Sequence, residues 1–301
     1  MIRRLRVLIG LLLAWRVLGP IITPRFRSPQ EHPWRIPGRT VFVGDSEFLV
    51  REFGNPDGTP VVLIHGLGGS SLAEWYRVAP LLAEGHRVIT LDHRSHGLSP
   101  KTVARFEVED IADDIAGIMA AVGVGRGAVV GYSMGGAIAQ ALAYRHPGVV
   151  DRLILVATFA HHPPFHRLTR AIAAWVIRSW ERITGIGNAE ARAAYLLGVG
   201  AVDRRHARWL WEETHRRDPE AGAAATFALL RFDSTPWIGQ VAIPALVVIP
   251  TADQLADPRW QYDLASRLPD VRVLELVGAL HEAPWTHAEE IAAGIEDFLR
   301  A

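Results

Sequence analysis

The sequence predicts an α/β fold in which helices flank a mostly parallel sheet and a helical insertion interrupts it. Three observations lead to this class. Short apolar runs alternate with amphipathic stretches from Val61 onward, as parallel strands alternate with crossover helices. The alternation stops over residues 159–237, where no run is typical of a strand. It resumes at Ala245 and continues to the C-terminus.

The elements follow from these runs in chain order. Residues 40–43 and 48–53 are expected to form a β-hairpin at one edge of the sheet. The further strands expected are 61–65, 88–92, 128–132, 152–157, 245–249 and 271–276. The helices expected are 108–122, 134–145, 259–268 and 289–299. Within the insertion, the spacing of Ile172, Val176 and Trp180 predicts amphipathic helices.

The composition is typical of a large globular domain and excludes several classes of protein. Of the 301 residues, 49% are apolar and 21% are charged, which excludes wholesale disorder. Lys and Arg number 32 and so do Asp and Glu, so the zero net charge argues against a nucleic-acid binder that neutralises phosphates. Cysteine is absent, which excludes disulfides, thiolate nucleophiles and cysteine-based metal sites.

Residues 1–39 differ from the rest of the chain. They carry eight arginines and one glutamate, a net charge of +7, which leaves −7 for the remainder. An apolar run at 7–15 is interrupted by Arg16 and resumes at 17–22, and nine residues are too few to span a bilayer, which takes about 20. The segment fits a signal peptide, a membrane anchor or interfacial helix, or a helix packed on the protein's own surface. We favour membrane association, with a cytoplasmic or exported protein as the alternative.

The strongest functional signal is the stretch Gly131-Tyr132-Ser133-Met134-Gly135, which lies between an expected strand and an expected helix. A Gly-x-Ser-x-Gly stretch in that context predicts a nucleophile elbow, a sharp turn that pushes the serine hydroxyl clear of the sheet. The two glycines lack side chains that would collide where strand and helix cross. The helix N-terminus also directs free amides at the site. The simpler alternative is a turn serine that caps the helix.

A second signal is the sequence HGLGG at residues 65–69, directly after a strand. A glycine-rich loop lets backbone amides approach a substrate oxygen. With Ser133 as nucleophile, the backbone N–H groups of Leu67 and Met134 would form an oxyanion hole. A phosphate-binding loop is the alternative, but neither a P-loop lysine nor G-x-G-x-x-G follows.

A serine hydroxyl needs a base, and we expect a histidine on a loop late in the chain. His281 follows the strand at 271–276, and His287, at the edge of the last helix, is its rival. The carboxylate that orients the base should end another strand. Asp253 does so after the strand at 245–249, and Asp257 competes with it. The order serine, aspartate, histidine is the one expected for this type of elbow.

Taken together, these motifs resemble the α/β-hydrolase superfamily, close to its capped esterases and lipases. The resemblance covers roughly residues 40–301 and includes DHRSHGLS at 92–99, which is similar to the family's D-x-R-G-x-G-x-S stretch. Three residues depart from the family pattern. Ser95 and Pro250 stand where glycine is usual, and Leu280 replaces a small residue before the histidine.

The resemblance implies an eight-stranded, mostly parallel sheet. Residues 40–158 and 238–301 would form the core, and residues 159–237 a helical cap over the nucleophile. The segment 1–39 lies outside the resemblance. The tryptophans and alanines of the cap suggest an apolar pocket, although ordinary packing between cap helices accounts for most of these tryptophans. The residues expected to face the substrate are His65, Gly66, Tyr132 and Trp175.

The function expected is hydrolysis of a small-molecule carboxylic ester, apolar or lipid-like, through an acyl-enzyme formed on Ser133 with His281 as base and Asp253 as its partner. A C–C bond hydrolase or a cofactor-free perhydrolase would use the same three residues. A non-catalytic, hydrolase-like binding protein is the alternative from another class. No metal, organic cofactor or nucleic acid is implied, and a membrane surface is a partner expected for residues 1–39.

Overall fold

The computed structural model describes residues 36–161, 194–215 and 218–301. The chain divides into two compact units. Of the described residues, 194–215 belong to one unit, which contains η1 (Arg204–His206) and α8 (Ala207–His215). The sheet and all other described elements belong to the second unit. Trp175 and most of the segment 1–39 lie outside the described residues.

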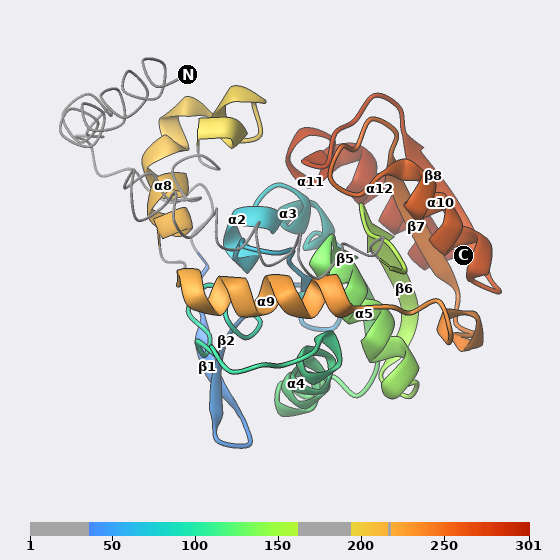
Figure 1. The fold of residues 1–301 in the computed structure, drawn as a ribbon, viewed down its shortest axis with the longest axis horizontal. Coiled ribbons are helices and arrows are strands. Elements are labelled where there is room, and N and C mark those ends of the chain that lie inside the picture. The colour runs from blue at the N-terminus through green and yellow to red at the C-terminus, as the bar shows by residue number, and fades with distance from the viewer. Residues whose placement is uncertain (1–35, 162–193, 216–217) are drawn as a thin grey trace, which may run out of the picture. The chain divides into compact units, whose positions relative to one another are not determined.

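The second unit is built on one eight-stranded sheet with the order β1-β2-β4-β3-β5-β6-β7-β8 (Figure 1). The strands are β1 (Arg39–Val43), β2 (Ser46–Gly54), β3 (Pro60–Ile64), β4 (Arg87–Leu91), β5 (Gly127–Tyr132), β6 (Val150–Val156), β7 (Ala245–Pro250) and β8 (Val271–Leu276). β2 pairs antiparallel with β1 and β4, and all other pairs are parallel. The edge hairpin and the mostly parallel sheet predicted from the sequence are confirmed.

Nine helical segments accompany the sheet in the described part of this unit. They are α2 (Ser71–Trp75), α3 (Val78–Leu82), α4 (Val108–Ala121), α5 (Met134–Arg145), α9 (Pro219–Arg231), η2 (Ile238–Gln240), α10 (Pro258–Arg267), α11 (Ala283–Thr286) and α12 (Ala288–Arg300). The strands and helices expected from the sequence agree with these bounds within two residues at each end. The helices α2, α3 and α11 were not expected, because four or five residues are too few to show a helical period.

Helices cover both faces of the sheet. Successive side chains of a strand point to opposite faces. Val62 and Ile64 of β3 join the large apolar cluster with α4, α5 and α10. The alternate residues Val61 and Leu63 are fully buried on the other face, where α3 packs against α12. Burial on both faces explains why these strands are continuous apolar runs.

Between β6 and β7, the described residues contain helices and no strand, only a single bridge between His161 and Asp233. α9 packs beside α4 in the sheet unit (Figure 1). Its Arg231 donates to the Glu107 carboxylate at 2.7 Å and to the Phe106 carbonyl at 2.7 Å. The cap role of 159–237 stays a prediction. None of the helices in the described ranges is long and apolar enough to cross a membrane.

The turn between β5 and α5 has a strained backbone at Ser133. Ser133 has φ 53° and ψ −118°, a conformation that side chains rarely adopt. A Cβ on Gly131 would overlap the carbonyl of Gly135, and a Cβ on Gly135 would overlap the carbonyl of Ile64. Strand and helix therefore cross so closely that only glycine fits, and the Thr158 hydroxyl donates to the Ser133 carbonyl at 2.7 Å.

We expect Gly131→Ala to destabilise the protein because its new methyl group meets backbone rather than a movable side chain. A cost of about 3 kcal/mol would lower Tm by about 6–12 °C. Gly148→Ala is the matched control, since its Cβ would meet open space and a change within about 0.5 kcal/mol is expected. Thermal unfolding followed by circular dichroism measures both. Equal Tm values for the two variants would contradict the close crossing.

Candidate active site

The structure brings Ser133, His281 and Asp253 together. The Nε2 atom of His281 lies 3.0 Å from the Ser133 hydroxyl oxygen, and Nδ1 lies 2.8 Å from Oδ2 of Asp253. The three residues follow β5, β8 and β7, which are parallel, so their loops meet at the same edge of the sheet. Asp253 and His281 are buried. A carboxylate at Nδ1 favours the tautomer whose Nε2 can accept the serine proton.

The two rivals named from the sequence have other contacts. Asp257 caps α10 and pairs with Arg259 at 2.6 Å. Hydrogen bonds from Arg259 lower the pKa of Asp257 to about 2. His287 is half-buried, and its Nδ1 lies 2.9 Å from the hydroxyl of the adjacent Thr286. The sequence left these alternatives open, and the geometry selects Asp253 and His281 as the pair beside Ser133.

Asp253 is held by four donors. Its Oδ1 accepts the N–H groups of Leu255 at 2.8 Å and Ala256 at 2.9 Å. Its Oδ2 faces His281 and also accepts the side-chain amide of Gln261 at 3.1 Å. Gln261 is fully buried on α10. Sequence reasoning missed it, because a lone glutamine eight residues beyond the aspartate belongs to no motif.

The HGLGG loop lies directly against Ser133. A Cβ on Gly66 would lie 3.1 Å from the Cβ of Ser133. The N–H of Gly66 donates to the buried Glu74 carboxylate at 2.5 Å, and the N–H of Gly68 donates to Nε2 of His96 at 2.8 Å. The amides on either side of Leu67 are therefore held in place.

Met134 supplies the second amide expected in the oxyanion hole. It is the first residue of α5, where an N–H has no acceptor within its own helix. Leu67 directly follows Gly66, and Met134 directly follows Ser133. Both predicted donors thus flank the point at which the loop and Ser133 touch.

Three imidazoles pack beneath this loop. The rings of His65 and His93 stack with centroids 4.0 Å apart, and that of His96 lies 4.2 Å from His93. His65 is fully buried; its Nδ1 donates to the Gly66 carbonyl at 2.8 Å and its Nε2 accepts the N–H of His93 at 3.3 Å. These contacts are with the loops themselves, so His65 supports the loop rather than facing a ligand. Within the described ranges, no His, Asp and Glu group is arranged to hold a metal ion.

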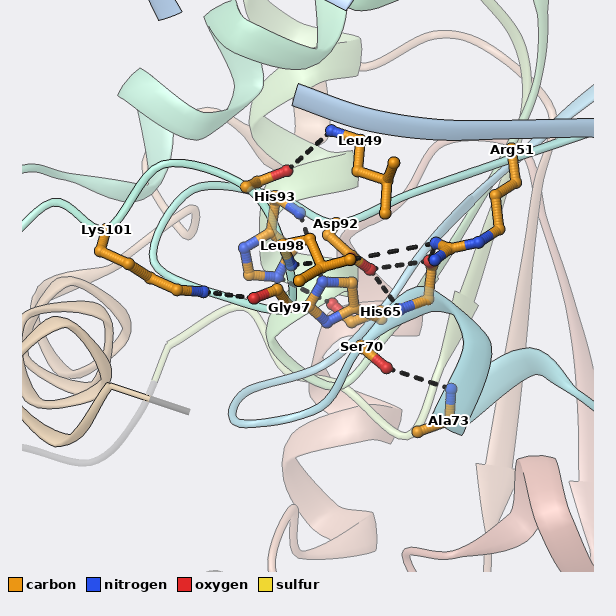
Figure 2. Close-up of polar contacts among 12 residues, drawn as sticks. Leu49, Arg51, His65, Ser70, Ala73, Asp92, His93, Gly97, Leu98 and Lys101 are labelled. Carbon is orange, nitrogen blue, oxygen red and sulfur yellow. Dashed lines mark hydrogen bonds and ion pairs between the residues drawn. The ribbon is translucent and has the colours of Figure 1, made fainter. Parts of the chain in front are cut away.

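Asp92 joins the same loops to the sheet, and Figure 2 shows Arg51 and His65 gathered around it. Its Oδ1 accepts both the N–H and the hydroxyl of Ser71, at 2.8 and 2.7 Å, and its Oδ2 accepts the N–H of Leu98 at 3.1 Å. Burial by itself raises the pKa of the Asp92 carboxyl. The neighbouring His65, the Arg51 guanidinium and the bonds from Ser71 more than offset it, so the pKa lies below its usual value.

The departure at Ser95 has a local explanation. Ser95 has φ 67°, the left-handed conformation for which glycine is usual. Its hydroxyl donates to the Thr102 carbonyl at 2.9 Å, and its N–H donates to the Pro100 carbonyl at 2.6 Å. These bonds hold a serine where the family pattern has glycine.

Tyr132 was expected to face the substrate. Only 3% of it is exposed, and its hydroxyl donates to the carbonyl of His281 at 3.0 Å. These contacts point into the protein. Trp175, the other aromatic residue expected there, lies outside the described residues.

Comparison with known proteins places the chain in a family. A family model of the alpha/beta hydrolase fold matches residues 59–190. A relative from Variovorax paradoxus, named as a carbamate hydrolase (RutD), is 31% identical over 254 residues, which are 82% of this chain and 93% of the relative. The chain belongs to the α/β-hydrolase family.

Two solved structures are similar to this hydrolase. The enol-lactonase from Burkholderia xenovorans LB400 has a TM-score of 0.75 and 26% identity, covering 87% of this chain and all of that one. A membrane phospholipase A has a TM-score of 0.73 and 25% identity, covering 98% of each chain. The family and these relatives support hydrolysis of a small-molecule substrate as the general activity.

The buried imidazole of His93 makes folding depend on pH. Burial lowers the pKa of His93 well below its usual value, and the neighbouring His65 and His96 lower it further. As the pH falls below about 6.5, the unfolded chain takes up a proton that the folded hydrolase does not. The stability due to neutral His93 is therefore present above that pH and is lost below it.

Replacing His93 by Phe keeps a flat ring and removes this titration. We expect the difference in free energy of unfolding between wild type and His93→Phe to shrink by up to about 1.4 kcal/mol from pH 7.5 to pH 5.5. Urea unfolding at the two pH values measures it. A difference that stays constant would contradict a neutral, buried His93.

Proposed function

We propose that this hydrolase cleaves carboxylic esters through a Ser133–His281–Asp253 triad and an acyl-enzyme intermediate. The proposal is carried by two hydrogen bonds, 3.0 Å from Nε2 of His281 to the Ser133 hydroxyl and 2.8 Å from Nδ1 to Asp253. A nucleophile, a base within hydrogen-bond reach and a group that orients the base are what covalent catalysis by serine requires.

In the first step, His281 accepts the proton of Ser133 as the hydroxyl oxygen bonds to the carbonyl carbon of the ester. The carbonyl oxygen becomes an oxyanion. Asp253 keeps the proton on Nδ1 and stabilises the imidazolium that forms. The pair of electrons on the oxyanion re-forms the carbonyl as the bond to the alcohol breaks, and His281 protonates the leaving oxygen. Water then enters and the same steps release the acid and restore Ser133.

The oxyanion is stabilised by the backbone amides of Leu67 and Met134. One such donor contributes about 10²–10³ to the rate in enzymes of this kind. Glu74 and His96 support this role, because they hold the amides of Gly66 and Gly68 on either side of Leu67. Donors fixed before the reaction need no reorganisation when the charge develops.

Acyl esters of a lipid surface are the substrate class we propose. A membrane phospholipase A is among the solved structures similar to this chain, and the match covers 98% of each chain. Residues 1–39 are basic and apolar in sequence. A basic, apolar segment binds anionic lipid surfaces through both of its features. Phospholipids offer carboxylic esters at that surface.

Carbamates are the second candidate, because the Variovorax relative is named for that activity. A carbamate also presents a carbonyl to a serine nucleophile, so the triad alone does not separate the two. Turnover of matched acyl esters, a lactone and a carbamate does so. We expect acyl esters to give the largest kcat/KM, and a preference for the carbamate would overturn the ester proposal.

Ser133→Ala tests the nucleophile. We expect kcat/KM on p-nitrophenyl esters to fall by about 10⁴ or more, and labelling by a fluorophosphonate probe to disappear. Ser266→Ala is the control, since this exposed hydroxyl only donates to the Asp263 carbonyl. Turnover or labelling that survives in folded Ser133→Ala protein would overturn the mechanism. A folded wild type that never labels would favour the non-catalytic alternative.

A protein lacking residues 1–35, which leaves β1 (Arg39–Val43) whole, tests the lipid surface. We expect it to keep turnover of soluble esters within about threefold and to lose most of its sedimentation with phosphatidylglycerol vesicles, because each arginine near an anionic surface contributes about 1 kcal/mol. Fatty-acid release from the same vesicles should fall in parallel. Equal sedimentation of the full and shortened chains would contradict the role of this segment.

A further inference from the structure

We propose that Tyr132 is a positioning residue whose hydroxyl sets the base His281 against the nucleophile Ser133. This inference deepens the proposed function and rests on it. Tyr132 touches no reacting atom in the mechanism above. It acts through the residue whose carbonyl it holds.

One hydrogen bond ties the nucleophile to the loop of the base. Tyr132 is the last residue of β5 and is bonded directly to Ser133. Its hydroxyl donates to the carbonyl of His281 at 3.0 Å, a link between residues 149 positions apart in the chain. Its ring centroid lies 5.2 Å from the imidazole. The side chain of Tyr132 therefore links the backbone next to Ser133 to the backbone of His281.

Packing fixes the direction of the tyrosine ring. Trp75 of α2 meets it edge-on with centroids 6.3 Å apart, and Trp285 of α11 does so at 5.8 Å. The indole N–H of Trp285 donates to the Ala73 carbonyl at 2.7 Å, which fastens α11 to α2. A ring held on two sides holds its hydroxyl in one place. The tether is rigid because the aromatic cluster around it is rigid.

The Tyr132 ring also packs against the proposed oxyanion loop. A Cβ on Gly66 would lie 3.2 Å from Cδ1 of Tyr132, so the ring packs against the backbone of the oxyanion loop. Nucleophile, base and oxyanion loop thus share one buried neighbour. Misplacement of a reacting group by about 1 Å costs about 10²-fold in rate, so a shared support of this kind controls rate more than binding.

His281 needs such a support because it lies in the loop between β8 and α11. Backbone bonds fix the residues before it, as Ala252 donates to the Ala279 carbonyl at 2.9 Å. The bond from Tyr132 acts on the carbonyl of His281 itself. Without the hydroxyl, this carbonyl would lose its partner in a dry region, and the loop would shift to find another.

Tyr132→Phe removes one oxygen and keeps the ring. We expect kcat on p-nitrophenyl esters to fall about tenfold or more while KM changes less than about twofold. The rate of fluorophosphonate labelling should fall with kcat. The downfield ¹H resonance of the His281 Nδ1 proton, shared with Asp253, should shift or broaden.

Two controls separate positioning from loss of stability. Ile118→Val removes one buried methylene from α4 and lowers Tm without touching the site. Tyr262→Phe removes a hydroxyl that bonds Glu275 at the surface. Both should keep kcat within about twofold and leave the resonance unchanged.

The outcomes divide cleanly. A Tyr132→Phe protein with wild-type kcat and an unshifted resonance overturns the tether and leaves the proposed function standing. The tether is also overturned if Ile118→Val loses as much kcat as Tyr132→Phe does when the two variants have the same fall in Tm. If the wild type neither turns over esters nor labels, the proposed function fails. The resonance then still decides whether Tyr132 places His281, because it reports the geometry of the His281–Asp253 pair without needing turnover or labelling.

Discussion

Ser133 is held in a backbone conformation, φ 53° and ψ −118°, that costs about 1–3 kcal/mol on its own. The positions of the other site residues depend on the surrounding structure holding Ser133 in this strained conformation. The crossing of β5 and α5 is close enough to require glycine at 131 and 135, and Thr158 donates to the Ser133 carbonyl. Because the surroundings enforce the turn, the hydroxyl leaves the sheet at one fixed point. His281, Asp253 and the glycine-rich loop are all arranged around this point.

Buried polar groups hold the loops that meet there. Glu74, His96 and Asp92 each accept backbone N–H groups from the two loops that follow β3 and β4. A buried carboxylate or imidazole left without partners is costly, so each of these contacts favours one loop conformation over its alternatives. Two buried groups beside these loops have shifted pKa values: burial lowers the pKa of His93, and the contacts of Asp92 with His65, Arg51 and Ser71 lower the pKa of that carboxyl despite its burial.

Much of this arrangement could be predicted from the sequence because it is local. Apolar runs located the strands, and the Gly-x-Ser-x-Gly stretch located Ser133, since both are properties of consecutive residues. The partners Asp253 and His281 could be named from their places after strands. The short helices α2, α3 and α11 were not predicted, because four or five residues show no helical period. Gln261 and Glu74 were not predicted either, because each acts through tertiary contacts that belong to no sequence motif. Tyr132 was expected to face the substrate, whereas its side chain is buried and its hydroxyl donates to the His281 carbonyl.

The central claim is a geometric one, that Ser133 attacks a carbonyl whose oxygen turns toward two backbone amides. A crystal structure of the protein after reaction with a p-nitrophenyl phosphonate tests it most directly, since the bound phosphonyl group imitates the tetrahedral intermediate. We predict phosphorus bonded to the Ser133 oxygen, with the phosphonyl oxygen about 2.7–3.1 Å from the nitrogens of Leu67 and Met134. Phosphorus on another residue, or an oxygen that points away from both amides, would contradict the account.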